Sequence, residues 1–213
     1  MAKGLTEPLG MHPSLEAYSV VADVLYETPT WSQIYDMLLG QAQKIQAVAY
    51  KPDAIVAVAR GGLIPGRILS DLLETSQLLI IQIEFYHGIA ETLKEPTLKQ
   101  GLVAPVQGKK VLVVDDIADS GRSLQLAKTH LKTQGASEIK TATLYYKPQA
   151  TEKPDFYEKQ TRNWVIFPWD TKETLRKITQ QHVGKRQVNA EIAKIVKSGL
   201  PKQLAEKLLK EMQ

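Results

Sequence analysis

Short apolar runs alternate with helical stretches over most of the chain. The runs predict five strands, over residues 54–59, 78–83, 111–114, 139–144 and 164–167. Between them, apolar residues recur at intervals of three or four, which predicts helices over 31–48, 63–73 and 123–134. This alternation indicates an α/β fold with a mostly parallel five-stranded sheet and flanking helices.

Two segments of the first 110 residues depart from this alternation. Residues 85–109 carry Gly, Pro, Lys and Glu without a sustained period, so we predict a long loop. Long loops in compact domains often act as lids. Residues 14–25 favour a further helix, and Pro29 ends that segment.

The last part of the chain, residues 171–213, has a different pattern. Three apolar stripes are separated by Gly184 and Gly199, and Pro201 suits the first turn of the last helix. We therefore predict a core over residues 1–170, which includes an N-terminal extension, and a basic three-helix appendage over 171–213.

The net charge of +4 is unevenly distributed. Residues 171–213 carry ten Lys or Arg and four Glu, a formal charge of +6, which leaves −2 for the remainder. A basic tail can attract nucleic acid, but it is more often the solvated face of amphipathic helices. The chain has no cysteine, which excludes disulfides, thiolate nucleophiles and cysteine-bound zinc. Because no apolar run suits a signal peptide or a membrane span of about 20 residues, we expect a cytoplasmic protein without membrane contact.

The most informative segment is residues 111–124, with the sequence VLVVDDIADSGRSL. A buried strand ends in Asp115 and Asp116, and a small loop with glycine and hydroxyl side chains then opens a helix. The two carboxylates can accept hydrogen bonds from a cis-diol or hold a hard cation. The loop amides and the helix amino end can hold a phosphate. The segment therefore predicts a site for a phosphorylated sugar at the carboxyl ends of the strands, where Arg60 also falls.

At these residues the chain resembles a type I phosphoribosyltransferase. The match is to that family's motif for phosphoribosyl pyrophosphate (PRPP): a hydrophobic strand, Asp-Asp, a spacer, an acid or small residue, then Ser-Gly-x-Ser. A phosphorelay receiver also places an acidic pair after an apolar strand. A receiver, however, needs a phosphoacceptor aspartate before its downstream lysine, and no aspartate lies between Asp119 and Lys147.

The resemblance implies an enzyme that converts PRPP and a purine base to a nucleoside 5′-monophosphate and pyrophosphate. Asp115 and Asp116 would hold the ribose diol and a Mg²⁺ ion, and the loop that follows would hold the 5′-phosphate. The PRPP-binding residues implied are Arg60, Gly61, Asp115, Asp116, Ala118, Asp119, Ser120, Gly121, Arg122 and Ser123. Arg60-Gly61-Gly62 resembles the family's pyrophosphate loop, so we expect a cis peptide bond before Arg60 or Gly61.

The base-binding residues follow from the same resemblance. Asp119 resembles the general base of 6-oxopurine transferases, and its alternative is a loop acid that bonds its own backbone. Lys147 would donate to the 6-oxo group, Trp164 would stack on the ring, Val165 would offer backbone contacts and Asp170 would accept from the ring edge. For Trp169 we expect a core position.

Two observations favour different bases. Asp119 and Lys147 suit hypoxanthine, guanine or xanthine. If adenine were bound, the lysine ammonium and the 6-amino group would be two donors facing each other, with no acceptor between them. The appended helices resemble those of crenarchaeal adenine phosphoribosyltransferases built on a 6-oxopurine-like frame. We favour adenine, converted to AMP, with a 6-oxopurine as the alternative.

A hypothesis of another class is a regulator that binds nucleic acid and senses PRPP or nucleotides. The basic tail motivates it, but His182 is the tail's only ring, so aromatic stacking platforms are missing. We therefore do not expect nucleic acid as a partner. A PRPP synthetase shares the motif, but two similar domains would be expected and no repeat is visible. The family resemblance makes a homodimer the default.

Overall fold

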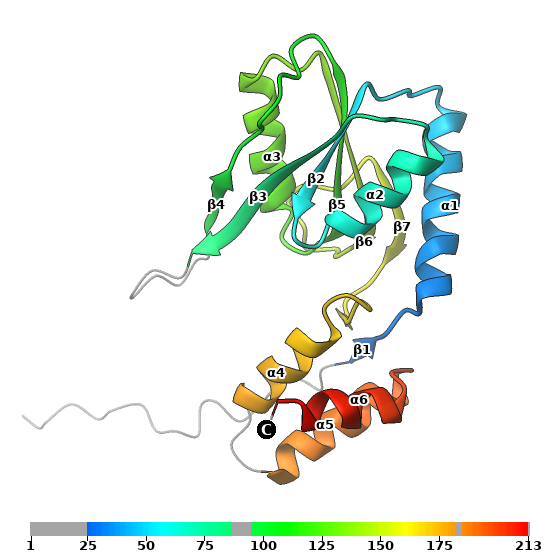
Figure 1. The fold of residues 1–213 in the computed structure, drawn as a ribbon, viewed down its shortest axis with the longest axis vertical. Helices are drawn as coiled ribbons and strands as arrows, with labels where there is room; N and C mark the ends of the chain where they lie inside the picture. Colours follow the sequence, from blue (N-terminus) through cyan, green and yellow to red (C-terminus); the bar gives the residue numbers. More distant parts are fainter. Residues whose placement is uncertain (1–24, 87–94, 182–184, 213) are drawn as a thin grey trace, which may run out of the picture.

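A six-stranded sheet forms the centre of the molecule. The computed structural model describes residues 25–86, 95–181 and 185–212. The sheet has the order β4-β3-β2-β5-β6-β7 (Figure 1). Its strands are β2 (Ala54–Ala59), β3 (Leu78–Tyr86), β4 (Glu95–Gln100), β5 (Lys110–Ala118), β6 (Glu138–Tyr146) and β7 (Phe156–Gln160). Neighbouring strands are parallel except β3 and β4, which pair antiparallel.

Helices cover both faces of this sheet. Helices α1 (Trp31–Ala47) and α2 (Leu63–Leu72) pack on one face, and α3 (Arg122–Thr133) packs on the other. Successive residues of β5 therefore enter different cores: Leu112 packs with α1 and α2, whereas Val113 packs with α3. Because both faces are buried, β2 and β5 are apolar without alternation, which is why their sequences predicted strands so clearly.

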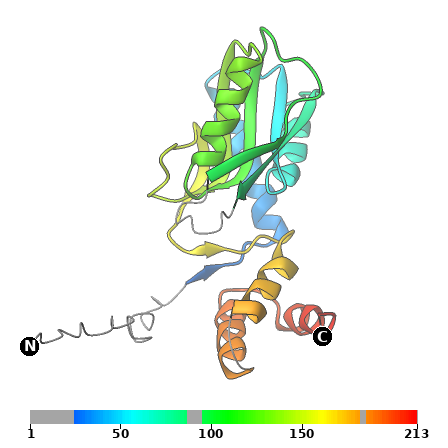
Figure 2. The same cartoon turned by 90° about the vertical axis from the view of Figure 1, so that its left-hand side faces the viewer.

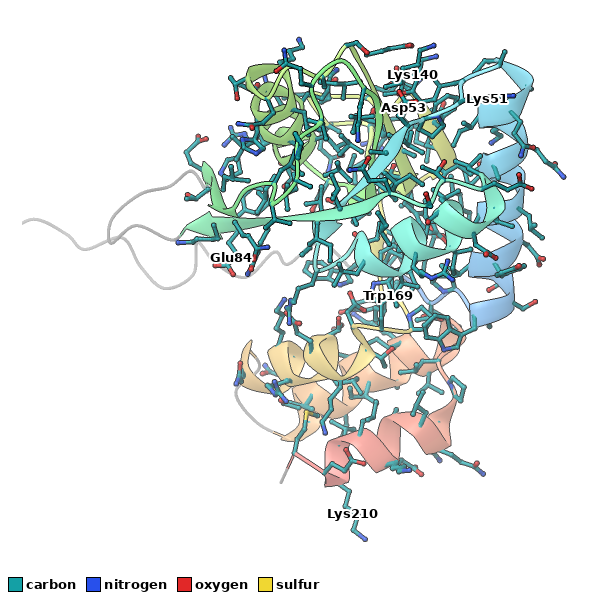
Figure 3. The ribbon with its side chains drawn as sticks, turned by 45° about the horizontal axis from the view of Figure 1, so that its top comes forward. Lys51, Asp53, Glu84, Lys140, Trp169 and Lys210 are labelled. Atoms are coloured by element: carbon teal, nitrogen blue, oxygen red, sulfur yellow. The ribbon has the colours of Figure 1, made fainter. Side chains whose placement is uncertain are left out.

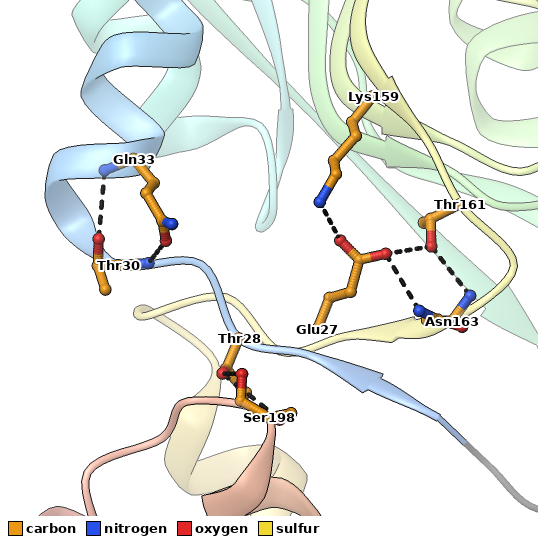
Figure 4. A network of polar contacts seen from close by, with 8 residues as sticks. All are labelled: Glu27, Thr28, Thr30, Gln33, Lys159, Thr161, Asn163 and Ser198. Atoms are coloured by element: carbon orange, nitrogen blue, oxygen red, sulfur yellow. Dashed lines mark hydrogen bonds and ion pairs between the residues drawn. The ribbon is translucent and has the colours of Figure 1, made fainter.

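A second, two-stranded sheet lies beside the first. Strand β1 (Tyr26–Glu27) pairs in parallel with β8 (Trp164–Val165). Glu27 holds this corner together, because its carboxylate accepts hydrogen bonds from Lys159, Thr161 and Asn163 (Figure 4). The Thr28 hydroxyl donates to the carbonyl of Ser198 at 2.8 Å, so β1 is also tied to the C-terminal helices.

The C-terminal helices form a small cluster below the carboxyl ends of the parallel strands (Figures 1 and 2). They are α4 (Thr171–Gln181), α5 (Lys185–Lys197) and α6 (Lys202–Lys210). Leu175, Ile195 and Ala205 are buried where the three helices meet, and Ile166 joins them from the segment after β8. Within the described ranges, no helix is both long and apolar enough to cross a bilayer. The domain boundary at residue 170 stays a prediction.

The fold class is confirmed, and the strand assignment needs three corrections. The central sheet has six strands rather than five, because β4 and β7 are additional edge strands. Residues 164–165 leave this sheet and pair with β1 instead. Residues 95–100 form β4, inside the segment predicted to be a loop. Most of the predicted helix over residues 14–25 lies outside the described residues.

Candidate active site

The acidic pair lies where strand β5 loses one of its neighbours. β5 pairs with β2 as far as Val114, whereas it pairs with β6 as far as Ala118. Asp115 and Asp116 therefore lie just beyond the last residue pair of β2 and β5, next to the end of β2 and the loop of Arg60. The parallel register places these side chains at the carboxyl edge of the sheet, where ligands bind in folds of this class.

Burial raises the pKa of both carboxyls, so it disfavours their charged forms. It raises the pKa of Asp115 well above its ordinary value, and the neighbouring Asp116 raises this pKa further. Burial also raises the pKa of Asp116 to about 6, against a hydrogen bond from the Trp169 indole that favours the charged form. Two buried carboxylates side by side repel one another, so a bound cation or a pair of hydroxyl donors would stabilise their charged forms.

A pocket of about 250 Å³ opens beside this pair. Its lining includes most of the residues predicted to bind PRPP: Arg60, Gly61, Asp115, Asp116, Ala118, Asp119, Ser120, Gly121 and Ser123. Arg122 is the exception, since it is not among the lining residues. Its guanidinium pairs with Glu95 of β4 at 3.0 Å. The geometry thus brings together the side chains and loop amides that a sugar phosphate would need.

The loop from Asp119 to Gly121 is fixed by the segment that follows Lys147. The backbone N–H and the hydroxyl of Thr151 both donate to the carbonyl of Ser120 at 2.9 Å. Gly121 has a φ of +78°, and a Cβ there would lie 2.5 Å from the backbone nitrogen of Glu152. Glycine is therefore required, and the loop leads directly into the amino end of α3, where a phosphate binds well.

The loop after β2 has the expected cis peptide bond, between Ala59 and Arg60. Gly61 lies directly under the acidic pair, because a Cβ there would approach Oδ2 of Asp116 to 2.3 Å. The Arg60 side chain is 76% exposed. Its Nη2 lies 2.5 Å from Oε2 of Glu173 in α4.

A second, larger pocket of about 980 Å³ adjoins the first. It lies between the end of the sheet, the segment around β8 and helix α4, and Figure 3 shows Trp169 in this region. Arg60, Gly61 and Asp116 line it as well, so the two pockets share a wall. Trp164 and Asp170 of the predicted base site line it as well.

Asp170 is held in an unusual environment. Burial raises its pKa to about 7, and the charges of Asp116 and Glu173 contribute in the same direction. Its Oδ1 is buried and accepts no hydrogen bond from any described residue. An acceptor without a donor at a pocket wall is a position that a ligand N–H group or a cation would satisfy.

Lys147 and Asp119 face one another at the loop. The Lys147 Nζ lies 3.8 Å from Oδ1 of Asp119, and Gln149 donates to the same oxygen at 3.4 Å. The lysine side chain is 11% exposed and the aspartate 66% exposed, so a largely covered lysine faces an accessible carboxylate. Of the predicted base-binding residues, Lys147 and the buried Val165 lie outside the lining of both pockets.

The sequence did not single out three residues of this site. Trp169, for which we expected a core position, is only partly buried: it stacks on Phe167 at 4.8 Å, lines the larger pocket and donates from its indole to Asp116. Glu173 and Lys177 line the larger pocket from α4. Trp169 could have been flagged by its place beside Asp170, whereas no local signal marks Glu173 or Lys177 among the many charges of an amphipathic helix.

The acidic pair fits the magnesium ion that the resemblance implies. No group of three or more His, Cys, Asp or Glu side chains suited to a metal occurs in the described part of the chain. Mg²⁺ needs no such group, since it usually takes one or two carboxylates and completes its shell with water and substrate oxygens. Asp115 and Asp116 offer that number of ligands.

Comparisons with known proteins agree with this geometry. Residues 30–174 match the family model described as phosphoribosyl transferase domain. The xanthine-guanine phosphoribosyltransferase of Gluconobacter oxydans is 35% identical over 152 residues, which cover 70% of this chain and 86% of that protein. The one from Ruegeria is 29% identical over 153 residues, 66% and 83% of the two chains.

Two solved structures resemble the chain in both fold and sequence. The purine phosphoribosyltransferase from Pyrococcus horikoshii has a TM-score of 0.62 and 36% identity, and the match covers 68% of this chain and 93% of that one. A Neisseria gonorrhoeae protein with bound ppGpp has a TM-score of 0.63 and 26% identity, over 69% and 90% of the two chains. The family match ends at residue 174, within α4, so most of the appended helices lie beyond it.

Proposed function

Because the chain belongs to the phosphoribosyl transferase domain family, we propose that it is a purine phosphoribosyltransferase of nucleotide salvage. It would transfer the phosphoribosyl group of PRPP to a purine base and release pyrophosphate. The observation that carries the proposal is the contact between two loops. Gly61 lies against Asp116, so the predicted pyrophosphate loop and the predicted diol-binding acids share one pocket.

We propose a 6-oxopurine as the base. The relatives include xanthine-guanine phosphoribosyltransferases, and a further solved relative carries ppGpp, a guanine nucleotide. They support the alternative that Asp119 and Lys147 suggested and not the preference for adenine. The Lys147 ammonium offers a donor that suits a 6-oxo group, whereas adenine presents donors of its own at that position.

The residues divide the work of this reaction. Asp115 and Asp116 would hold the ribose diol and Mg²⁺, which when bound neutralises the charge of the pyrophosphate leaving group. The loop from Ala118 to Ser123 would hold the 5′-phosphate through its amides and hydroxyls. Asp119, the proposed catalytic residue, would hold the proton at N7 of the base, since it is accessible and close to Lys147.

The base would lie where the two pockets meet, between Asp119 of the smaller pocket and Trp164 and Asp170 of the larger one. Trp164 is 47% exposed at the wall of the larger pocket, which leaves the indole face available for stacking on a purine ring. The unpartnered Oδ1 of Asp170 would accept a hydrogen bond from the ring edge. Val165 is buried and would contribute through its backbone only.

The test is nucleotide synthesis by the full chain with PRPP, MgCl₂ and each of guanine, hypoxanthine, xanthine and adenine. We expect the nucleoside 5′-monophosphate and pyrophosphate in equal amounts, with kcat/KM for a 6-oxopurine at least tenfold above that for adenine. A preference for adenine would overturn the base assignment. Salt-sensitive binding of RNA or DNA without nucleotide synthesis would overturn the enzyme and favour a regulator.

We also propose that the protein works in the cytoplasm as a homodimer, as the family resemblance implies. Trp31, Tyr35 and Leu39 are exposed at intervals of four along α1, and an apolar stripe of this kind suits an interface between copies. Light scattering at micromolar concentration should give twice the chain mass of 23.7 kDa. A monomer at all concentrations would contradict this assembly.

A further inference from the structure

One carboxylate of helix α4 holds two cations at the wall of the larger pocket. Oε2 of Glu173 lies 2.5 Å from Nη2 of Arg60, and Oε1 lies 2.9 Å from Nζ of Lys177. All three side chains line the pocket. The pair Glu173–Lys177 is an i,i+4 pair of α4, whereas Arg60 comes from the loop after β2, so the bridge joins the appended helix to the loop.

Arg60 is the residue that a diphosphate would meet at this loop. Its carbonyl accepts a hydrogen bond from the backbone N–H of Leu63 at 3.2 Å, and its side chain, which lines the pocket, is 76% exposed. A guanidinium presents a planar fork that fits two oxygens of a carboxylate or of a phosphate. Glu173 thus engages the group that the diphosphate would need, with the same kind of acceptor.

We propose that Glu173 sets the affinity of this site for diphosphate: it occupies the Arg60 guanidinium in the free protein, and the pyrophosphate group must displace it. This inference rests on the proposed function, because it takes the pyrophosphate of PRPP or free pyrophosphate as the ligand. It extends that function by giving the appended helix a part in the reaction, as a source of residues that regulate substrate and product binding.

The displacement is feasible because the Glu173 carboxylate keeps a partner. When Arg60 turns to the diphosphate, Oε1 of Glu173 stays with Lys177, so no unpaired charge remains at the wall. The Arg60–Glu173 pair is partly exposed, at 76% and 34% of the two side chains. Such pairs contribute little and are weakened by salt, so a multiply charged ligand can replace them.

Lys177 affects the charge at this pocket wall through the same carboxylate. It is a cation at the pocket wall, and by holding one oxygen of Glu173 it reduces the negative charge that faces the ligand. Removing it leaves Glu173 with Arg60 as its remaining partner in the bridge. The two residues of α4 should therefore act in opposite directions on diphosphate affinity. Lys177 also lies three residues beyond the family match, which ends at 174.

The experiment is calorimetric titration of the full chain with inorganic pyrophosphate and MgCl₂. The variants are Glu173→Gln and Lys177→Gln. The matched control is Glu206→Gln, which removes the same charge from an i,i+4 pair with Lys202 on α6. We expect Kd to fall about threefold in E173Q, as for loss of an exposed ion pair. It should rise in K177Q and stay unchanged in E206Q. The gain in E173Q should shrink in 0.5 M NaCl, where the screening length is about half of its physiological value.

The outcomes separate this inference from the proposed function. If the wild type neither binds pyrophosphate nor makes nucleotide, the proposed function fails. If the wild type binds pyrophosphate and E173Q binds it equally well or more weakly, the competition is wrong, because Glu173 then positions Arg60 or is irrelevant to it. Glu173→Asp provides a second variant should E173Q fold poorly. Its shorter side chain withdraws from Arg60, and an unchanged or higher Kd would likewise overturn the inference.

Discussion

The indole N–H of Trp169 donates a hydrogen bond to Oδ2 of Asp116 across 3.3 Å. The same ring stacks on Phe167 and lies 5.7 Å from the ring of Trp31. A tryptophan whose apolar faces pack in the core therefore has its one polar atom on the carboxylate that we expect to hold PRPP. The packing and the hydrogen bond can be separated experimentally, because a phenylalanine at this position keeps most of the ring packing and has no N–H to donate.

Trp169→Phe should weaken PRPP binding in a pH-dependent way. The hydrogen bond favours the charged form of Asp116, so its loss should move the pKa of this carboxyl above about 6. The acid limb of kcat/KM for PRPP should then shift to higher pH, with a loss of about fivefold near pH 6 and less at pH 8. Trp31→Phe changes a ring that contacts the same indole and should leave the limb in place. A uniform loss at all pH values would show that only packing matters.

Asp119→Asn should reduce turnover and leave binding nearly intact. If Asp119 holds the proton at N7, its amide variant should lose about 10²–10⁴ in kcat, the usual contribution of a general base. KM for PRPP should change little, and melting temperature should not change, because this side chain is 66% exposed. Gln149→Ala removes the 3.4 Å hydrogen bond to the same carboxylate and serves as the control. Full turnover by the asparagine variant would remove the assignment.

Lys147→Met should lower kcat/KM for 6-oxopurines more than for adenine. Methionine keeps the apolar stem and lacks the donor, so kcat/KM for a 6-oxopurine should fall about 10- to 100-fold, as for loss of a charged hydrogen bond. Activity with adenine should fall much less, since its 6-amino group gains nothing from the ammonium. Lys153→Met, in the loop that follows, removes a lysine that lies over the rings of Tyr146 and Tyr157 and controls for charge. An equal loss for all four bases would point to a structural role.

Asp170→Asn should stabilise the protein above neutral pH. The pKa of Asp170 is raised to about 7 in the folded state, so its contribution to stability is fully present below the ordinary carboxyl pKa and is lost as pH rises toward 7. The neutral amide does not suffer this loss. The free energy of unfolding in urea should therefore favour the variant at pH 8, and the difference should shrink at pH 5 and vanish below pH 4. A difference independent of pH would contradict the raised pKa. Asp71→Asn, at a carboxyl that is 71% exposed, gives the background.

Gly61→Ala should abolish PRPP binding. The added Cβ would lie 2.3 Å from Oδ2 of Asp116, so either the loop or the acidic pair must move. Gly40→Ala is the matched control: its Cβ meets only the end of the flexible Glu158 side chain at 3.3 Å, and alanine favours the helix. Titration with PRPP and thermal melting would compare the two variants. Normal PRPP affinity in the Gly61 variant would show that the two loops need not touch.

The strands that carry the site were predictable because both of their faces are buried. Val111 to Val114 read as a strand for that reason, and the polar loop after it marks the carboxyl edge of the sheet. The edge strands were not predictable in the same way. β4 has no fully buried residue, and in β7 only Phe156 is buried, so neither shows a continuous apolar run. Edge strands are commonly short and charged, since this prevents pairing with other chains.

Contacts between distant segments account for the other differences. Trp164 and Val165 have the composition of a strand, but they pair with Tyr26 and Glu27 and not with the central sheet. A pairing of two residues leaves no periodic signal in the sequence. The Arg60–Glu173 pair likewise depends on where α4 lies relative to the loop after β2. Local patterns indicate which residues are candidates to bind a phosphate. They do not specify which helix comes to stand over the pocket.

The parallel pairing of Tyr26–Glu27 with Trp164–Val165 joins segments that are translated at different times. The first of these strands leaves the ribosome long before the second is translated, and its anchor at Ser198 emerges later still. β7 ends at Gln160, before β8 begins at Trp164, so all strands of the central sheet are translated before β1 has its partner. A polypeptide released early would thus contain the whole of the proposed phosphate loop, while the wall that α4 contributes to the larger pocket is still missing. The finished catalyst would arise only as the last helices dock.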